Sequence, residues 1–214
     1  MSEFQVISFR ALDRPVSDAN LKFMAMQSTR ADITPWSFDN EYWYGDFSGD
    51  TIGMLRRGYD FHVHYANFGI RKIMMTLPAG FPHAQRAKPF LIPNEIHFIR
   101  NERGKGGILC LEPRADLVRA NELPSPWQMI DRLLPLRQEI SAGDLRPLFL
   151  AHLATVFEPD EALAKKLPVP PGLKRLTRAQ KALVEFFGVT DELLAWAAAR
   201  SASLPAPKRS EQNN

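Results

Sequence analysis

A concentration of aromatic residues between Trp36 and Phe68 constrains the fold of this chain more than any other feature. All four tyrosines and two of the four tryptophans lie in this window. Aromatic side chains bury a large area and also carry a polar handle, so such a concentration marks either the packing centre of a domain or a binding face. Residues 36–44 alternate in the way that a strand does, with side chains on two opposite faces. The sequence therefore predicts one strand over residues 32–44 with a heavily aromatic face.

The segments on either side of this strand alternate between strand and helix patterns. Residues 4–9 have the short, aromatic-rich pattern of a strand. Residues 17–28 carry apolar side chains at helical spacing after Ser17, a suitable N-cap. A second helix is predicted over residues 50–66 with Asp50 as its N-cap, and an alternative interpretation makes residues 61–66 a strand.

Three more strands are predicted in the middle of the chain, over residues 70–77, 95–100 and 107–112. The last two flank the glycine-rich stretch 103–107, whose glycines supply the positive φ angles of a hairpin. This stretch lacks the spacing of a phosphate-binding loop and leads into a strand, so it is not predicted to bind phosphate.

The texture of the sequence changes after Pro113, from strand patterns to helical ones. We expect an α+β fold, with a mixed or antiparallel sheet covered by helices and followed by a C-terminal helical region. The predicted organisation is a main domain over residues 1–157 with a helical hairpin at 125–157, a stiff, extended, proline-rich linker at 158–175, a helical hairpin at 176–201 and a disordered tail at 202–214.

The C-terminal helical hairpin has the clearest boundary signals in the sequence. Thr177 and Gln180 have the spacing of a capping box. Gly188 is predicted to end the first helix, and Thr190 to cap the second.

Composition places the chain among ordinary globular proteins, with 45% hydrophobic and 24% charged residues. The single cysteine, Cys110, excludes a disulfide within the chain and is predicted to be a small buried thiol. No apolar run approaches the roughly 18 residues of a membrane span, and the N-terminus does not have the pattern of a secretory signal. We therefore expect a soluble, cytoplasmic protein without a membrane segment.

The leading functional hypothesis is a non-catalytic protein-binding or assembly module. Its predicted binding face comprises Tyr42, Trp43, Asp46 and Arg71. Aromatic residues and arginine are enriched at the centres of protein interfaces, and the sequence contains no recognisable catalytic motif. The expected partner is another protein, and no cofactor is predicted.

A small hydrolase-like enzyme is the second hypothesis. Glu41, Asp46 and His62 or His64 could line a cleft, because an apolar setting raises the pKa of a carboxyl group towards neutrality. On a strand, the two histidines would lie on one face and could hold a metal together with Glu41 or Asp46. Asp39 could also join such a site. No metal-binding spacing accompanies these residues, so neither a metal nor a catalytic residue is assigned.

Nucleic-acid binding is the third hypothesis. Basic residues occur at 56–57, 71–72, 100–105 and 174–181, and beside exposed aromatic rings they could bind a single strand. The formal excess of three positive charges is small, and nucleic-acid sites are clustered stripes of charge. Scattered, solvated faces are the favoured interpretation.

Several segments resemble a family of bacterial proteins to which no activity, cofactor or catalytic residue has been assigned. They are FRALDRP, TPWSFDNEYWYGDF and YANFGIRKIMMTLP, followed by PLRQEISAGDLRPLFLA and PVPPGLKRLT. The resemblance covers most of residues 4–200 and departs from the family pattern at 80–115. It implies a bacterial, cytoplasmic origin and transfers no functional residue to this chain.

Overall fold

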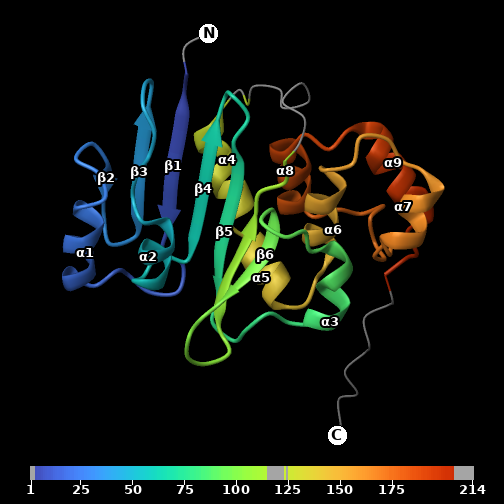
Figure 1. Cartoon of the computed structure of the whole chain (residues 1–214), viewed down its shortest axis with the longest axis horizontal. Helices are drawn as coiled ribbons and strands as arrows, with labels where there is room; N and C mark the ends of the chain where they lie inside the picture. The colour runs from blue at the N-terminus through green and yellow to red at the C-terminus, as the bar shows by residue number, and fades with distance from the viewer. Residues whose placement is uncertain (1–2, 115–122, 124, 205–214) are drawn as a thin grey trace, which may run out of the picture.

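The fold is built on a seven-stranded sheet in which every pair of neighbouring strands is antiparallel (Figure 1). A computed structural model describes residues 3–114, 123 and 125–204. The strand order is β2-β3-β1-β4-β5-β7-β6, which confirms the predicted α+β class with an antiparallel sheet. The strands are β1 (Gln5–Arg10), β2 (Asp32–Ile33), β3 (Ser37–Tyr42), β4 (Phe61–Ala66), β5 (Arg71–Leu77), β6 (Ile96–Arg100) and β7 (Gly107–Leu111).

One face of the sheet packs on a small apolar cluster with the helices α1 (Asp18–Ala25) and α2 (Thr51–Arg56). Phe9 lies at the centre of this cluster, with Phe38 and Tyr59 rings 5.6 and 5.7 Å from its own. Both helices lie at the N-terminal end of the colour range, beside β1 to β4 (Figure 1). We call this the N-terminal face.

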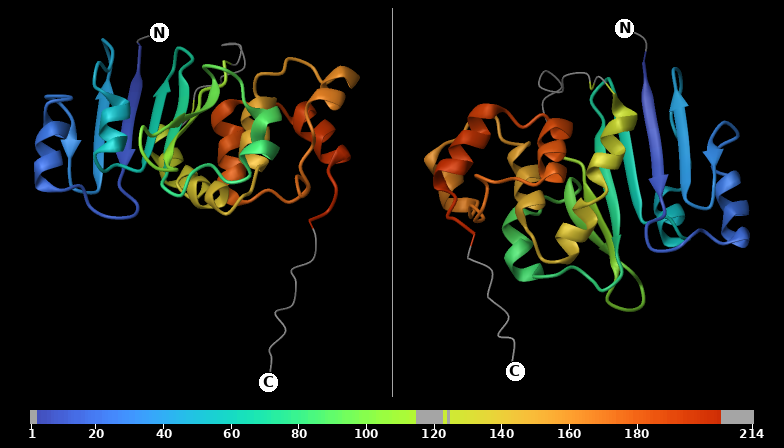
Figure 2. Two further views of the ribbon diagram at one scale, coloured as in Figure 1. Left: turned by 60° about the horizontal axis from the view of Figure 1, so that its bottom comes forward. Right: turned by 180° about the vertical axis from the view of Figure 1, so that it is seen from behind.

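The opposite face carries a larger core formed with the C-terminal helices (Figure 2). We call it the C-terminal face. Phe149 of α6 and Phe186 of α8 are among the largest fully buried side chains there. The C-terminal helices are α4 (Pro126–Leu133), α5 (Leu136–Ser141), α6 (Arg146–Leu153), α7 (Glu161–Lys166), α8 (Arg178–Phe187) and α9 (Asp191–Arg200). Between β5 and β6 the chain forms α3 (Ala84–Ala87) and the 3-10 helix η1 (Lys88–Phe90).

The predicted helix over residues 50–66 is wrong, and the alternative strand at 61–66 is confirmed as β4. The helix ends at Arg56, and Gly58 has a φ of +141°, a conformation that no helix continues. Pairing with β1 and β5 on both sides then fixes residues 61–66 as a central strand. The predicted cap is confirmed, because Asp50 accepts a hydrogen bond from Gly53 N.

The single strand predicted over residues 32–44 is divided into β2 and β3. Thr34 and Pro35 form a tight connection, in which Thr34 Oγ1 accepts hydrogen bonds from Trp36 N and Ser37 N. Proline cannot donate to a ladder, so a continuous strand through residue 35 is excluded.

The helical hairpin predicted at 125–157 contains three helices, α4, α5 and α6. The first predicted helix is interrupted at Pro135, which is the N-cap residue of α5. Gly143, with a φ of +90°, turns the chain between α5 and α6 as the sequence indicated.

The predicted extended linker at 158–175 is wrong at residues 161–166, which form α7 with Asp160 as its N-cap. Leu167 and Leu173 are buried in the same core as the sheet and the C-terminal helices. The hairpin predicted at 176–201 is observed as α8 and α9, with the Thr177–Gln180 capping box, a left-handed Gly188 and the Thr190 cap. Residues 205–214 of the predicted tail lie outside the described residues.

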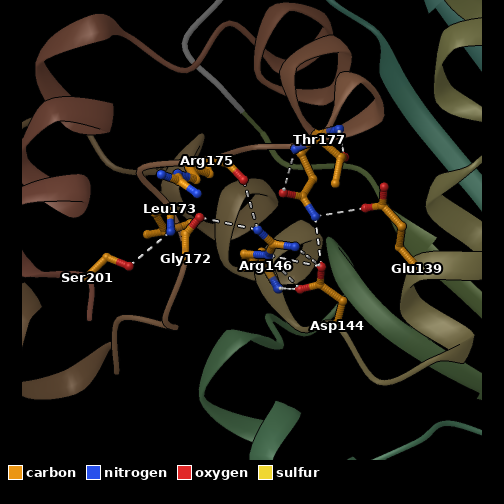
Figure 3. Close-up of polar contacts among 9 residues, drawn as sticks. Glu139, Asp144, Arg146, Gly172, Leu173, Arg175, Thr177 and Ser201 are labelled. Carbon is orange, nitrogen blue, oxygen red and sulfur yellow. Dashed lines mark hydrogen bonds and ion pairs between the residues drawn. The ribbon is translucent and has the colours of Figure 1, made fainter. Parts of the chain in front are cut away.

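A polar network joins the last helices to the rest of the C-terminal half (Figure 3). Arg146 forms hydrogen bonds of 2.6 to 3.0 Å with the Asp144 carboxylate, and it also donates to Gly172 O and Arg175 O. Gln180 of α8 donates from Nε2 to both Glu139 and Asp144. The network therefore connects α5, α6, α8 and the segment before α8 around one buried guanidinium.

No helix within the described ranges is long and apolar enough to cross a membrane.

Candidate functional site

Trp43 projects from the end of β3 and is held in place although half of it is exposed. Its relative exposure is 52%, and the neighbouring Tyr44 is 78% exposed. The indole N–H of Trp43 donates to Glu41 Oε1 at 2.7 Å, and the Trp43 ring lies 4.8 Å from that of Phe4. Trp127 of α4 donates to the other oxygen of Glu41 at 3.2 Å. Glu41 therefore holds two indoles at once and orients the exposed ring.

The backbone at the same end of β3 faces an open edge. Thr34 N donates to Ser37 O at 2.8 Å, so the backbone N–H and C=O of Ser37 point away from β1. The backbone groups of successive residues in a strand point alternately to its two sides. Those of Asp39 and Glu41 therefore point away from β1, as those of Ser37 do. The β2 ladder pairs Asp39 with Asp32 and ends there. Beyond it, no strand in the described part of the chain lies beside the N–H and C=O of Glu41.

Tyr42 and Asp46 lie on the N-terminal face of the sheet, the side opposite Glu41. The Tyr42 hydroxyl accepts a hydrogen bond of 2.8 Å from Asn40 Nδ2, and Asp46 Oδ1 accepts one of 3.0 Å from Gln5 Nε2. Asp46 is exposed and Tyr42 is half-buried. Tyr42 and Asp46 are therefore close to Trp43 in the chain, but their side chains lie on the face of the sheet opposite Glu41.

Arg71 does not join this surface. It is only 4% exposed, and its guanidinium lies 4.1 Å from the centre of the Tyr65 ring. It also donates to Ala66 O at 2.7 Å and to Ile70 O at 3.1 Å. Burial lowers the pKa of this guanidinium, and the electrostatic interaction and hydrogen bond with the Tyr65 side chain oppose that shift. β1 and β4 separate β5 from β3, so Arg71 has a structural role at a distance from Trp43.

His62 is fully enclosed on the N-terminal face. Its ring stacks on Phe9 at 4.2 Å, and Nδ1 lies 3.0 Å from Ser8 O. A carbonyl only accepts, so Nδ1 carries the proton and donates. Burial, together with the neighbouring His64, lowers the pKa of His62 well below its ordinary value. His62 is therefore a neutral core residue.

His64 and Asp46 are connected through Gln5. Gln5 Nε2 donates to Gly45 O and to Asp46, so Gln5 Oε1 is the acceptor for His64 Nε2 at 2.8 Å. This arrangement fixes the proton of His64 on Nε2. Burial, aided by the positive charge of Lys72, lowers the pKa of His64 to about 4. A neutral imidazole at physiological pH results.

Glu41 is not part of this chain of hydrogen bonds. It lies on the C-terminal face, whereas His62, His64 and Asp46 belong to the N-terminal face. The predicted meeting of Glu41 with a histidine does not occur. Within the described ranges, no group of three or more His, Cys, Asp or Glu side chains is placed to hold a metal. Cys110 is buried, as predicted, and burial raises the pKa of its thiol to about 12.

A cleft of about 980 Å³ lies between α2 and the β6–β7 hairpin. Two of the carboxylates that line it, Asp13 and Asp60, are bound within the protein; Glu102 also lines the cleft. Asp60 accepts from the backbone N–H groups of Leu12 and Asp13 and from Thr76 Oγ1. Arg137 donates to both oxygens of Asp13, and this pairing lowers the pKa of Asp13. Asp13 and Asp60 therefore hold parts of the chain together at this cleft.

The basic groups in the sequence lie in several places. Arg56 and Arg57 line the same cleft, where Arg57 lies over the Phe23 ring at 4.2 Å, whereas Arg100 and Lys105 line a second groove. Lys72 pairs with Glu112 at 2.9 Å, and residues 174–181 lead into α8. Trp43 and Tyr44 do not line this cleft.

Sequence reasoning missed Gln5 and Trp127, which organise the two sides of this region. Gln5 is 1% exposed and bridges His64 to Asp46, while Trp127 reaches Glu41 across 86 positions of sequence. A polar residue inside an apolar strand pattern was the only local signal for Gln5. Nothing near Trp127 indicated its partner.

Comparison with known proteins adds no assignment. The chain matches no protein-family model, no curated protein and no solved structure.

Proposed function

We propose that this protein is a non-catalytic protein-binding module whose partner contacts the end of β3 around Trp43 and Tyr44. The exposed but immobilised Trp43 ring is the observation that carries this proposal. Tryptophan and tyrosine dominate the binding energy of protein interfaces. A ring that is already fixed by Glu41 and Phe4 loses little conformational entropy when a partner covers it.

The open edge of β3 supports the same proposal. Glu41, with its outward N–H and C=O, precedes Trp43 by two residues, so a partner backbone can add hydrogen bonds close to where the rings supply apolar contact. Tyr42 and Asp46 extend the surface onto the neighbouring face. Arg71, which is buried, is left out of it.

Trp36 provides a matched control for the test of this surface. It is 51% exposed, almost the same as Trp43, and it lies at the other end of β3. Proteins captured from bacterial cytoplasm by the wild-type chain should include one whose affinity falls about tenfold or more for Trp43→Ala, as expected for a hot-spot ring. Trp36→Ala should retain that protein. Binding of the purified pair by calorimetry then measures the loss.

Two further results sharpen the test. Glu41→Gln keeps the size of the side chain but weakens the hydrogen bonds to both indoles, so it should reduce affinity by less than Trp43→Ala does. Equal capture by the wild type, Trp43→Ala and Trp36→Ala would reject the proposed surface.

The enzyme hypothesis has weaker support in the geometry. The Asp46–Gln5–His64 chain brings a carboxylate and an imidazole into one hydrogen-bonded line. The lowered pKa of His64 and the enclosure of His62 make both imidazoles weak bases at neutral pH.

Nucleic-acid binding would be revealed by retention on a polyanion column that weakens steeply as salt is raised.

A further inference from the structure

The second edge of the sheet, formed by β6, borders a groove that no described element fills. The groove has a volume of about 720 Å³ and lies between β6 and the segment 79–93. Volumes of this order are typical of sites that hold a small ligand or a few residues of a peptide.

The backbone of β6 presents unused hydrogen-bonding groups along this edge. Asn101 N donates to Gly106 O on the β7 side, and Glu112 N donates to Glu95 O. Odd-numbered residues of β6 therefore face β7, and even-numbered residues face outwards. Ile96 already pairs with Ile92 through two hydrogen bonds of 2.8 and 2.9 Å. The N–H and C=O groups of Phe98 and Arg100 follow along the open edge.

The chain itself borders both ends of the groove. At one end, Ile92 and Ile96 form an isolated bridge. At the other end, Gly80 lies so close to Lys105 that a Cβ on Gly80 would be 2.7 Å from Lys105 O. The unpaired part of the edge, from Phe98 to Arg100, spans about 7 Å at the rise of a β-strand, so it accommodates roughly two or three residues. This length suits the end of a peptide chain better than a segment that passes through.

The walls combine apolar side chains with three cations, which are Arg100 and Lys105 near Gly80 and Lys88 of η1. The rings of Phe81 and Phe98 stack at 5.3 Å, and Leu91 continues the apolar wall. Arg100 and Lys105 lie at the end that Gly80 borders, and neither forms an ion pair with a described residue. No Asp or Glu is among the residues that line the groove. A negative charge is therefore favoured at this end and opposed nowhere along the groove.

We propose that this groove binds the C-terminal end of an extended peptide from a partner protein. Its backbone adds to β6 through the N–H and C=O groups of Phe98 and Arg100. Its terminal carboxylate lies beside Arg100 and Lys105, and an apolar side chain near its end packs on Phe81. Strand addition and the capture of a terminal carboxylate are both established modes of peptide recognition. The site is separate from the Trp43 surface and does not depend on it.

A pair of peptide libraries tests this proposal with the full-length protein. Acetylated pentapeptides randomised at their last three positions are prepared with a free carboxylate and, in parallel, with a C-terminal amide. Affinity selection should enrich members of the acid library only. The amide of the best peptide should bind about tenfold more weakly, the effect of losing a charge-assisted contact.

Variants and probes locate the binding. Arg100→Gln and Lys105→Gln should each weaken the best peptide several-fold, whereas Lys181→Gln, which removes an exposed lysine from α8, should not. N-methylation of the peptide backbone should weaken binding, and the amide signals of Phe98 and Arg100 should shift in nitrogen–proton NMR spectra of the complex. Dodecanoate serves as a carboxylate with an apolar chain and no peptide backbone.

Four results would overturn the proposal. They are the absence of enriched acid peptides, equal binding of the acid and the amide, indifference to Arg100→Gln and Lys105→Gln, and binding of dodecanoate as tight as that of the best peptide. Peptides that instead shift the amide signals around Trp43 would contradict this site while supporting the surface at β3. The two proposals can therefore fail independently.

Discussion

The two edges of the sheet differ in how their unpaired backbone groups are protected. An edge strand leaves backbone groups unpaired, and proteins usually shorten, cover or charge such edges. The β3 edge is shortened by the two-residue β2 and carries exposed aromatic rings beyond it. The β6 edge is bordered by the segment 79–93 and carries cations, with a groove between them. This difference is the basis for the two proposed contacts, an aromatic surface for a folded partner at β3 and a groove for the end of a peptide at β6.

The edges also differ in what supports them. β3 rests on the small cluster around Phe9 and on the short helices α1 and α2. β6 packs against α6 and shares the large core of the C-terminal helices, which the Arg146 network ties together. If this division is real, a change made on one side should loosen the nearer edge more than the farther one.

Removal of Arg146 should give the largest effect. Arg146→Ala leaves the partly buried Asp144 carboxylate without its cation, and breaking such a pair costs about 3 kcal/mol. Urea unfolding should show this loss of stability. Hydrogen exchange should show lost protection in α6, α8 and β6, with β3 nearly unchanged.

Arg132→Ala is the matched control for that experiment. The Arg132–Glu185 pair has the same kind of geometry at 2.8 Å, but its side chains are 48% and 45% exposed. Its removal should change stability by less than about 1 kcal/mol. Equal loss of protection at β3 and β6 in Arg146→Ala would show that both edges depend on one cooperative unit.

Acidification should weaken the β3 side next. The pKa of His64 is lowered from 6.5 to about 4, so the unfolded chain takes up a proton before the folded chain does. Stability is complete above pH 6.5 and falls as the pH drops from about 6.5 towards 4. This shift corresponds to a loss of about 2 kcal/mol between pH 7.5 and pH 5, and the lowered pKa of His62 acts in the same direction.

Urea unfolding at a series of pH values measures this dependence. His64→Gln should flatten the fall in stability between pH 7.5 and pH 5, whereas His83→Asn, which changes an exposed residue, should leave it intact. Asparagine suits that position because His83 has a φ of +51°. An unchanged slope in His64→Gln would show that this imidazole is not the source of the pH dependence.

The sequence predicted those elements whose local signals agree with one another. β1, β5 and the β6–β7 hairpin were predicted within a residue or two, and so were both ends of α8. At residues 52–66 the local signals conflicted. Ile52, Leu55, Tyr59 and Val63 fit a helical period, while Phe61, Val63 and Tyr65 fit a strand, and only pairing with β1 and β5 decides between the two.

The candidate site was predictable in its residue types but not in its arrangement. Its setting in the chain predicts Trp43 as an aromatic anchor, and the structure shows that its ring is half exposed. Glu41, which orients Trp43, also accepts a hydrogen bond from Trp127. A contact between residues so far apart in the chain leaves no local pattern in the sequence. Arg71 looked like a surface residue because arginine is seldom buried without compensation. Here the Tyr65 ring and two carbonyl groups provide that compensation, which only the folded chain reveals.

The smallest losses of stability should come from substitutions at the helix caps. One cap lies on the β3 side and one on the β6 side, so the same kind of substitution can be made on both. Thr177 caps α8 on the β6 side, and Asp50 caps α2 on the β3 side. Replacement of either by alanine should cost about 1 kcal/mol, because one N–H at the helix start loses its acceptor. Thr177→Ser and Asp50→Asn retain an acceptor and should be nearly neutral. Calorimetric melting gives the size of each loss, and hydrogen exchange gives its location. Asp50→Ala should loosen β4 before β6, and Thr177→Ala should do the reverse. If both variants loosen the same strands, the sheet transmits strain across its full width, and occupation of one edge would then be felt at the other.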